Sequence, residues 1–578
     1  MIISRQRWLS WIGAMVLSLI ASTTMYPVVR GLERPAASPN TDALLDAARR
    51  DDTEAVNILV ARRADVNAKS DDGTTALAWA VMHSNAAITE RLLNAGANPN
   101  LANTYGITPL HVAVENAASA IVARLLAKGA NPNIARDSGE TPLMTAARTD
   151  QVEIARLLLA HHADVNAREK KFGQTALMWA AHDPALVRLF IDAGADLNLT
   201  TNSWDITAAI PGASFRTVGV TGVPWVFEGE YSSKKGGQNA LMFAVQHRSS
   251  DSVRLLLDAG VNVNSRSADS TTPLLLALYK WENLDGRNAV FAPDLPTAAL
   301  LIERGASVTA ADDQGYTPLH GAVLAATLGA PRNARGRGGR SGATPAAPGG
   351  RGASGANGTT PQGPSRTDWM QFVSRLLDAK ADPNAAVVHP TTGGAGTRLN
   401  APSGGSTPLH VAAGSADVEL VELLCGRGAS PNVIRKDGLS PFAVAVQADN
   451  LDVVKALVRA GANLHQRYNP STTVPDPVEP IAMPRQNQTI MHVAAIAHAS
   501  KSIEYLFSVG VSLTDKNALD ETPLEMAENQ EVFEYVLAYE GTGAGGGVWR
   551  PRDFTTSDTI RRLLHVPTLA SYSDGTVR

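Results

Sequence analysis

The amino-acid sequence predicts an all-α repeat solenoid, made of stacked helix-turn-helix units with short β-hairpin loops. The chain has 578 residues, which is beyond the size at which a single hydrophobic core stops growing. A T-[PA]-L motif recurs at intervals of 33, 33 and 34 residues, with its threonine at Thr75, Thr108, Thr141 and Thr175. Each interval holds two short amphipathic segments, and helices of that length are not stable alone in water. Stacking on identical neighbours would stabilise them, so a solenoid is expected.

The same motif position recurs through most of the remaining chain. Its further copies start at Thr272, Thr317, Thr407 and Thr522, and Asn239, Ser440 and Thr489 fill the slot in divergent copies. About twelve units can be counted between residues 41 and 540. The first unit lacks the full motif and the last, Thr522–Tyr539, is polar, as expected for units that shield the ends of a solenoid.

Residues Gly106–Asn133 illustrate one unit. Thr108 is a suitable N-cap, and Pro109 stands at the first helical position, where a missing N–H costs nothing. Apolar residues then follow with helical spacing. Those expected to face inward are Leu110, Ala113 and Val114 in the first helix, and Ile121, Val122, Leu125 and Leu126 in the second. Gly129 is expected to end the second helix in the left-handed conformation.

Three copies carry the fuller pattern T-P-L-H, at Thr108–Ala113, Thr317–His320 and Thr407–Ala412. A G-A-N/D-x-N ending follows at Gly96–Asn100, Gly129–Asn133 and Gly194–Asn198. These residues resemble the ankyrin-repeat family. The resemblance implies that the motif histidine makes structural hydrogen bonds to neighbouring repeats. It also implies that hairpin tips and first helices form a concave surface for binding proteins.

Insertions interrupt the 33-residue period near residues 199–237, 281–296, 331–366, 385–405 and 466–487. The second and third separate the two helices of a unit, whereas the first and fourth extend hairpins. Segment 331–366 is rich in Gly, Pro and Arg and has too few apolar residues to order itself. Segment 199–237 instead holds several aromatic residues, which gain most from burial. Two interpretations stay open for it: recognition of a ligand, or packing against its own repeats.

The two termini differ in character. Residues 1–30 have Arg5 and Arg7 before an uncharged, mostly apolar stretch, which is typical of a cleavable export signal or of an N-terminal membrane anchor. In both cases the positive-inside rule places the later residues outside the cytoplasm, in a periplasmic or extracellular location. Residues 31–40 are expected to be a linker, and 541–578 a flexible tail with a possible short helix over 559–564.

The sequence offers little support for catalytic chemistry. We find no zinc, P-loop or hydrolase-elbow motif, so no cofactor, metal or catalytic residue is predicted and the chain is not expected to be an enzyme. The net charge of −4 gives no general attraction to nucleic acid. The only cysteine, Cys425, follows an apolar helical run and is expected to be buried and inert. Trp79, Trp179 and Phe243 stand at equivalent motif positions and are expected to pack between repeats.

The leading hypothesis is an exported scaffold that binds a protein partner. The residues expected to contact it lie at the hairpin tips and in the aromatic insertion: Asp71, Asp72, Thr104, Tyr105, Lys171, Phe172, Trp204, Trp225, Asp313, Tyr316 and Lys436. Two alternatives are kept. One places a small-ligand or catalytic site in the insertion loops, and the other makes the chain a structural protein anchored at the cell envelope.

Overall fold

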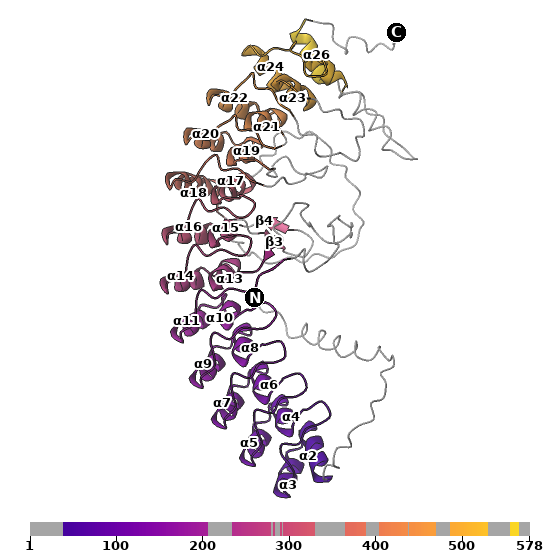
Figure 1. The fold of residues 1–578 in the computed structure, drawn as a ribbon, viewed down its shortest axis with the longest axis vertical. Coiled ribbons are helices and arrows are strands. Elements are labelled where there is room, and N and C mark those ends of the chain that lie inside the picture. The colour runs from indigo at the N-terminus through magenta and orange to yellow at the C-terminus, as the bar shows by residue number, and fades with distance from the viewer. Residues whose placement is uncertain are drawn as a thin grey trace, which may run out of the picture. The chain divides into compact units, whose positions relative to one another are not determined.

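The computed structural model describes residues 39–205, 234–278, 281–283, 289–291, 293–329, 364–388, 404–436, 438–469, 486–529 and 555–565. The chain divides into two units, Met1–Ala130 and Asn131–Arg578. In each unit, pairs of antiparallel helices stack one after another (Figure 1). The predicted all-α repeat solenoid is confirmed.

The first unit holds three helix pairs within its described residues. They are α2 (Pro39–Arg49) with α3 (Thr53–Ala61), α4 (Ala76–Met82) with α5 (Ala86–Asn94), and α6 (Pro109–Glu115) with α7 (Ser119–Ala127). First helices pack on first helices and second helices on second helices of the next pair.

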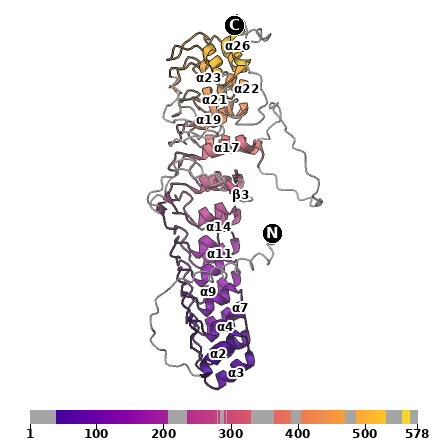
Figure 2. The same ribbon diagram turned by 90° about the vertical axis from the view of Figure 1, so that its right-hand side faces the viewer.

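The second unit continues the same plan, and its second helices α9, α11 and α14 follow one another in the turned view (Figure 2). Its first helices are α8 (Pro142–Arg148), α10 (Ala176–Trp179), α13 (Ala240–Gln246), α15 (Pro273–Leu278), α17 (Pro318–Gly329), α19 (Pro408–Ala413), α21 (Pro441–Gln447) and α23 (Ile490–Ile496). Its second helices are α9 (Val152–Ala160), α11 (Pro184–Asp192), α14 (Ser250–Asp258), α16 (Leu295–Glu303), α18 (Arg366–Asp378), α20 (Val418–Gly426), α22 (Leu451–Arg459) and α24 (Ser500–Ser508).

The motif residues form the helix ends as predicted. The Thr108 hydroxyl accepts a hydrogen bond from the backbone N–H of His111, and the His111 ring accepts one from the backbone N–H of Thr108. Pro109 is the first helical residue. Gly129 ends α7 with a φ of +83°, a conformation that glycine adopts without steric cost.

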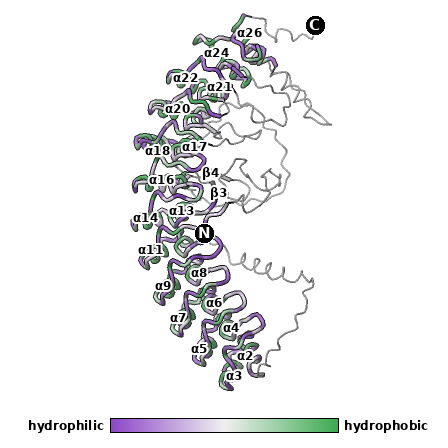
Figure 3. Tube along the Cα trace, in the orientation of Figure 1, coloured by the Kyte–Doolittle hydropathy of each residue, from purple (hydrophilic) through white to green (hydrophobic). Residues whose placement is uncertain are grey.

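The core lies between the stacked helices. Every residue predicted to face inward in α6 and α7 is at most 3% exposed. Small residues such as Ala113 and Ala146, both fully buried, allow adjacent helices to approach closely. Hydrophobic residues accordingly follow the helices in Figure 3, whereas the loops between pairs are mostly hydrophilic. Burial against neighbours therefore supplies the stability that short helices lack alone.

Ion pairs connect consecutive second helices. Arg375 of α18 pairs with Glu303 of α16 at 3.2 Å, and Arg459 of α22 pairs with Glu422 of α20 at 2.9 Å. The last described helix, α26 (Thr555–Leu563), follows this rule, because its Arg562 pairs with Glu504 of α24. Helix α26 therefore packs beside the second helix α24.

Two expectations concern the C-terminus. The terminal repeat was expected to end at Tyr539, and this stays a prediction because residues 530–554 lie outside the described residues. The segment 541–578 was expected to be a flexible tail with a possible helix over 559–564. The helix begins earlier, at Thr555, and Ile560 is fully buried. Burial of this one apolar side chain among Thr and Ser explains why the sequence showed only part of the helix.

Short backbone pairings join described residues of three of the insertions. In the first, β1 (Trp204–Asp205) pairs antiparallel with β2 (Lys234–Lys235), so this insertion leaves and re-enters the stack at one point. In the second, β3 (Trp281–Asn283) pairs antiparallel with β4 (Ala289–Phe291) between α15 and α16. Tyr468 and Gln488 exchange backbone hydrogen bonds of 2.8 and 2.9 Å across the fifth.

Two insertion boundaries differ from the expected ones. The second was expected to end at residue 296, but α16 begins at Leu295, capped by Asp294. The third was expected to end at residue 366, but Arg366 is already helical, because Ser365 and Asp368 form a capping box. Neither cap follows a T-P-L motif, so the sequence period did not mark it.

Within the described residues, no helix is both long and apolar enough to cross a lipid bilayer. The N-terminal segment with the predicted signal or anchor, residues 1–30, lies outside them.

Candidate protein-binding surface

Hairpin tips of adjacent repeats are joined by backbone hydrogen bonds. In the first unit, the N–H of Thr104 donates to the carbonyl of Asp72 at 2.9 Å. In the second unit, the N–H groups of Lys170, Ala268, Asp313, Val388, Lys436 and Ala518 each donate to the preceding tip, over 2.7 to 3.1 Å. Each tip is thus held by its neighbour, which fixes the backbone of an exposed row of residues.

Asparagine side chains at the base of the hairpins bond each repeat to the following one. The Asn133 amide donates to the carbonyl of His162 at 2.9 Å, and its side-chain oxygen accepts from the N–H of Asp164 at 2.7 Å. The same pair of bonds is made by Asn67, Asn166, Asn264, Asn384 and Asn432. The G-A-N-x-N ending was visible in the sequence, but its bonds to the following repeat were not.

Basic side chains add a third connection that sequence reasoning missed. The Arg168 guanidinium donates to the carbonyl of Thr200 at 2.6 Å, and Arg266 and Arg467 bond the carbonyls of Ala311 and Lys516. All three residues stand two positions after the last residue of the hairpin ending, which is Asn166, Asn264 or His465. That constant offset was the only signal in the sequence, and it becomes meaningful once the hairpins are stacked.

The predicted contact residues of the first unit are exposed. Asp71 and Asp72 lie at one tip and Thr104 and Tyr105 at the next, and the Tyr105 side chain is 64% exposed. Asp72 also has a structural role, because its carboxylate accepts hydrogen bonds from Ser70 and Thr74, which lower its pKa. Tyr105 is therefore the residue of this group that is free to contribute apolar area to a contact.

Three predicted residues of the second unit come together. The rings of Phe172 and Trp204 lie 5.5 Å apart at an angle of 51°, and the Lys171 ammonium lies 4.7 Å from the centre of the Phe172 ring. Trp204 remains 41% exposed. This end of the aromatic insertion therefore packs on its own repeat and still presents apolar surface. Trp225 lies outside the described residues.

The remaining predicted contact residues differ in how far they are exposed. Asp313 and Lys436 are exposed, whereas Tyr316 is half-buried against the ring of His320 at 5.9 Å. Burial raises the pKa of Tyr316 to about 12. The sequence placed Tyr316 at the tip, but it points back toward the first helix, so only part of it can face a partner.

Comparison with known families agrees with the repeat geometry. The family model for ankyrin repeats in three copies matches residues 44–136, 115–201 and 371–468, and the single ankyrin-repeat model matches residues 236–268. These segments make up about half of the chain. The chain belongs to the ankyrin-repeat family.

Two curated relatives share part of this ankyrin region. The chain is 33% identical over 222 residues to human Ankyrin repeat and SOCS box protein 16, which covers 38% of this chain and 42% of that protein. It is 32% identical over 149 residues to the mouse B-cell lymphoma 3 protein homolog, covering 25% and 30%. The chain thus spans less than half of the relatives it matches. Ankyrin repeats generally serve as protein-binding scaffolds.

Three motif histidines of the second unit connect neighbouring ankyrin repeats, as the resemblance implied. The Nε2 atoms of His320, His410 and His492 lie 3.2, 3.2 and 2.9 Å from the carbonyls of Ser406, Leu439 and Glu521. Burial lowers the pKa of His320 to about 4 and that of His410 to about 3, with Arg435 lowering the latter further. The pKa of His492 is also lowered by burial. These rings are neutral structural groups at physiological pH.

The tryptophans of the first helices also pack between ankyrin repeats. In the first unit the Arg49 guanidinium lies 5.5 Å from the centre of the Trp79 ring, and in the second Arg148 lies 5.6 Å from that of Trp179. The Trp179 indole N–H donates to Gln174 at 2.9 Å. Both rings and that of Phe243 are half-buried, so they retain some area on the first-helix face.

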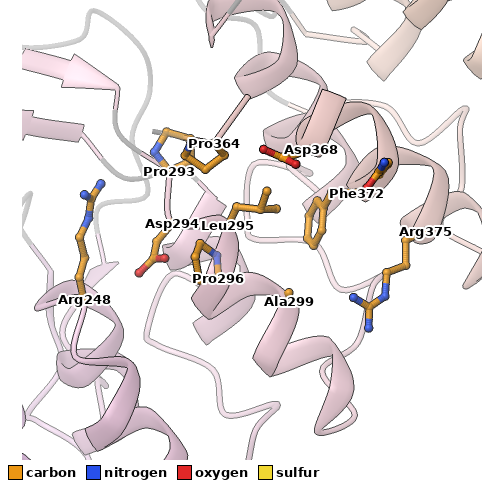
Figure 4. A pocket seen from close by; sticks show the side chains of 11 residues that line it. Arg248, Pro293, Asp294, Leu295, Pro296, Ala299, Pro364, Asp368, Phe372 and Arg375 are labelled. Carbon is orange, nitrogen blue, oxygen red and sulfur yellow. The ribbon is translucent and has the colours of Figure 1, made fainter. Parts of the chain in front are cut away.

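A cavity of about 670 Å³ lies between α16, α18 and the turn that joins α13 to α14 in the second unit (Figure 4). Its apolar lining includes Leu295 and Phe372. Its two carboxylates already have structural partners: Asp294 caps α16 at Thr297, and Asp368 caps α18 at Ser365. Such committed groups do not favour acid–base catalysis here.

The metal-binding and nucleophilic side chains among the described residues also give no support for a catalytic site. Among the residues described, no three His, Cys, Asp or Glu side chains are placed to hold a metal ion. Cys425 is half-buried rather than fully buried, and burial together with Glu422 raises its pKa to about 11. A thiol with that pKa is a weak nucleophile at neutral pH.

The Asp312 carboxylate lies where a negative charge is unfavourable. Burial and the nearby Asp269 and Asp313 carboxylates raise its pKa to about 6, although the N–H groups of Gln314 and Tyr316 donate to it at 2.9 Å. At the same slot of another ankyrin repeat, Asn103 accepts the equivalent two bonds at 3.0 Å without a charge.

We therefore expect Asp312→Asn to stabilise the second unit at neutral pH. A carboxyl group whose pKa is raised on folding contributes stability below its unfolded pKa, and this is lost as the pH rises through about 6. The gain should be about 1–2 kcal/mol at pH 8 and close to zero at pH 4. Urea unfolding at both pH values measures it. An equal gain at both would contradict the electrostatic explanation.

Proposed function

We propose that this chain is an exported scaffold that binds another protein through its hairpin tips and the first-helix face. The main support is the row of tips whose backbones are fixed by neighbour-to-neighbour hydrogen bonds and whose side chains are exposed. Rigid presentation lowers the entropy lost on binding. Exposed aromatic residues on that row, Tyr105 in the first unit and Trp204 in the second, are suitable anchors.

Affinity capture tests the binding function. The region after residue 38 is immobilised, and proteins that co-purify from the exported fraction of the source cells are identified and then re-tested one by one. A purified partner that binds directly and saturably supports the proposal. Absence of any saturable partner under these conditions contradicts it.

Tyr105→Ala and Phe172→Ala, alone and together, are expected to weaken binding of such a partner. An aromatic anchor contributes about 2 kcal/mol, so each affected contact should lose roughly thirtyfold in Kd. Phe507→Ala is the matched control, because Phe507 is an aromatic residue of second helix α24 that is 38% exposed away from the tips. Calorimetry measures the Kd values. Equal affinity of the double variant and the parent protein would place the contact elsewhere.

We further propose that residues 1–30 direct export, because Arg5 and Arg7 precede an uncharged stretch from Trp8 to Val29. Cell fractionation tests this, followed by an alkaline wash of the membranes. Release of the protein by the wash indicates a cleaved, soluble form, and retention indicates an anchor. Recovery in the cytoplasm alone would contradict export.

A further inference from the structure

The tip before the first insertion and the start of that insertion form a surface that we call the lysine–tryptophan surface. It consists of Arg168, Lys170, Lys171, Phe172 and Trp204. Two hydrogen bonds make it one unit: the N–H of Asn202 donates to the carbonyl of Phe172 at 2.6 Å, and the Arg168 guanidinium donates to the carbonyl of Thr200. The basic groups and the exposed ring are therefore held together before any partner arrives.

The exposed charge of this surface is positive. Arg168, Lys170 and Lys171 are exposed. The acid between them, Glu169, is turned inward and 7% exposed, where its oxygens accept the N–H groups of Lys171, Phe172 and Gln174.

An apolar site adjoins these charges. Trp204 is 41% exposed although it contacts Phe172, and exposed tryptophan is unusual on a surface that has no partner. The Lys171 ammonium lies over the Phe172 ring, which keeps that charge next to the aromatic pair. A partner that fits must carry negative charge and an apolar side chain close together.

We propose that the lysine–tryptophan surface binds an acidic polypeptide segment that carries an apolar residue between its carboxylates. The inference rests on the proposed scaffold function and specifies the partner of one of its surfaces. Carboxylates on the segment pair with Lys170 and Lys171, and its apolar side chain covers Trp204. Charge complementarity of this kind mainly speeds association and selects the partner, whereas the ring contact slows dissociation.

The test uses the full chain without its first 38 residues and a fluorescent synthetic peptide of glutamate and leucine. Twin peptides with glutamine or lysine in place of glutamate serve as probes of charge, and an oligothymidylate as a probe of nucleic acid. Binding of the glutamate peptide alone, weakening as salt rises, is expected. Preference for oligothymidylate, or equal binding of the glutamine peptide, would overturn the proposal.

Variants then locate the site. K170E/K171E should weaken binding of the glutamate peptide at least tenfold at low salt, and Trp204→Ala about tenfold. Lys501→Glu on second helix α24 is the matched control and should change binding less than about twofold. Unchanged melting curves will show that the variants fold, and K170Q/K171Q should give an intermediate loss.

These results separate the two proposals. If K170E/K171E binds the peptide as well as the parent protein does, the acidic-segment inference is wrong. A captured protein partner that still binds this variant with its original Kd would then leave the scaffold function intact. Loss of the captured partner and of the peptide together supports both.

Discussion

Lowering the pH from 7 to 4 is expected to destabilise the second unit by several kcal/mol. The cause is the buried motif histidines, whose pKa values in the folded state are about 4 for His320 and about 3 for His410. An unfolded histidine has a pKa of about 6.5. As the pH falls below that value, the unfolded chain binds protons that the folded chain excludes, so stability is lost progressively until the folded pKa is reached.

The size of this effect can be bounded. Each pKa unit corresponds to about 1.4 kcal/mol, so at pH 4 each of the two rings destabilises the fold by at most about 3 kcal/mol. His492 acts in the same direction. Asp312 opposes them weakly, because its raised pKa makes the folded state more stable as the pH falls through about 6. The histidines outweigh it.

Other repeats of this chain already carry methionine in place of the motif histidine. Met144, Met178 and Met242 occupy the histidine slot in other repeats and are at most 2% exposed. The triple variant His320→Met, His410→Met, His492→Met should therefore fold, yet lose most of the pH dependence between 7 and 4.

At pH 8 the same variant should lose about 1–3 kcal/mol per site, because carbonyls such as those of Ser406 and Leu439 lose a donor. Urea unfolding followed by circular dichroism from pH 4 to 8 measures both effects. If the triple variant and the parent protein show the same slope of stability against pH, the acid sensitivity has another origin.

Replacing Tyr468 by alanine is expected to cost about 3–5 kcal/mol, as for other fully buried aromatic side chains. Tyr468 is 0% exposed and is the largest of the fully buried side chains described. Its hydroxyl lies 3.2 Å from that of Ser440, and its backbone pairs with Gln488. The residue therefore fills the core and also closes the described ends of the fifth insertion.

Two comparisons make this expectation specific. Tyr468→Phe should cost only about 1 kcal/mol, because it removes the hydroxyl contact and keeps the ring. Tyr105→Ala, at an exposed position of the first unit, should change stability by less than about 0.5 kcal/mol. Denaturant unfolding gives the three values, and hydrogen exchange at the Gln488 amide reports on the local pair. Protection of that amide in Tyr468→Ala would show that the insertion does not depend on this ring.

Much of the fold could be predicted because the signals are local and repeated. Thr108 marks a cap, Pro109 a first helical residue and Gly129 a left-handed end wherever the motif occurs, and each effect acts within a few residues. The C-terminus could not be predicted in the same way. In α26 the buried side chains include Thr556 and Ser557 as well as Ile560. A segment with so few apolar residues shows no strong helical periodicity of hydrophobic residues in its sequence.

For the predicted contact residues too, local sequence patterns revealed one part of the arrangement and only the structure revealed the other. The sequence placed Lys171 and Phe172 at a tip and Trp204 in an insertion, and the structure brings the three together. It also turns Tyr316 toward His320, which no local pattern indicated. Side-chain direction at a tip depends on the neighbouring repeat, which lies some 30 residues away or beyond an insertion.

The sequence by itself determined the repeat unit, its helices and their inward faces, because capping, helical periodicity and glycine conformation are properties of short segments. Only the tertiary structure decided which groups connect one repeat to the next: the bonds of Asn133 and Arg168, the position of α26 and the pairing of Phe172 with Trp204. Those contacts join residues distant in sequence, and their geometry exists only once the repeats have stacked.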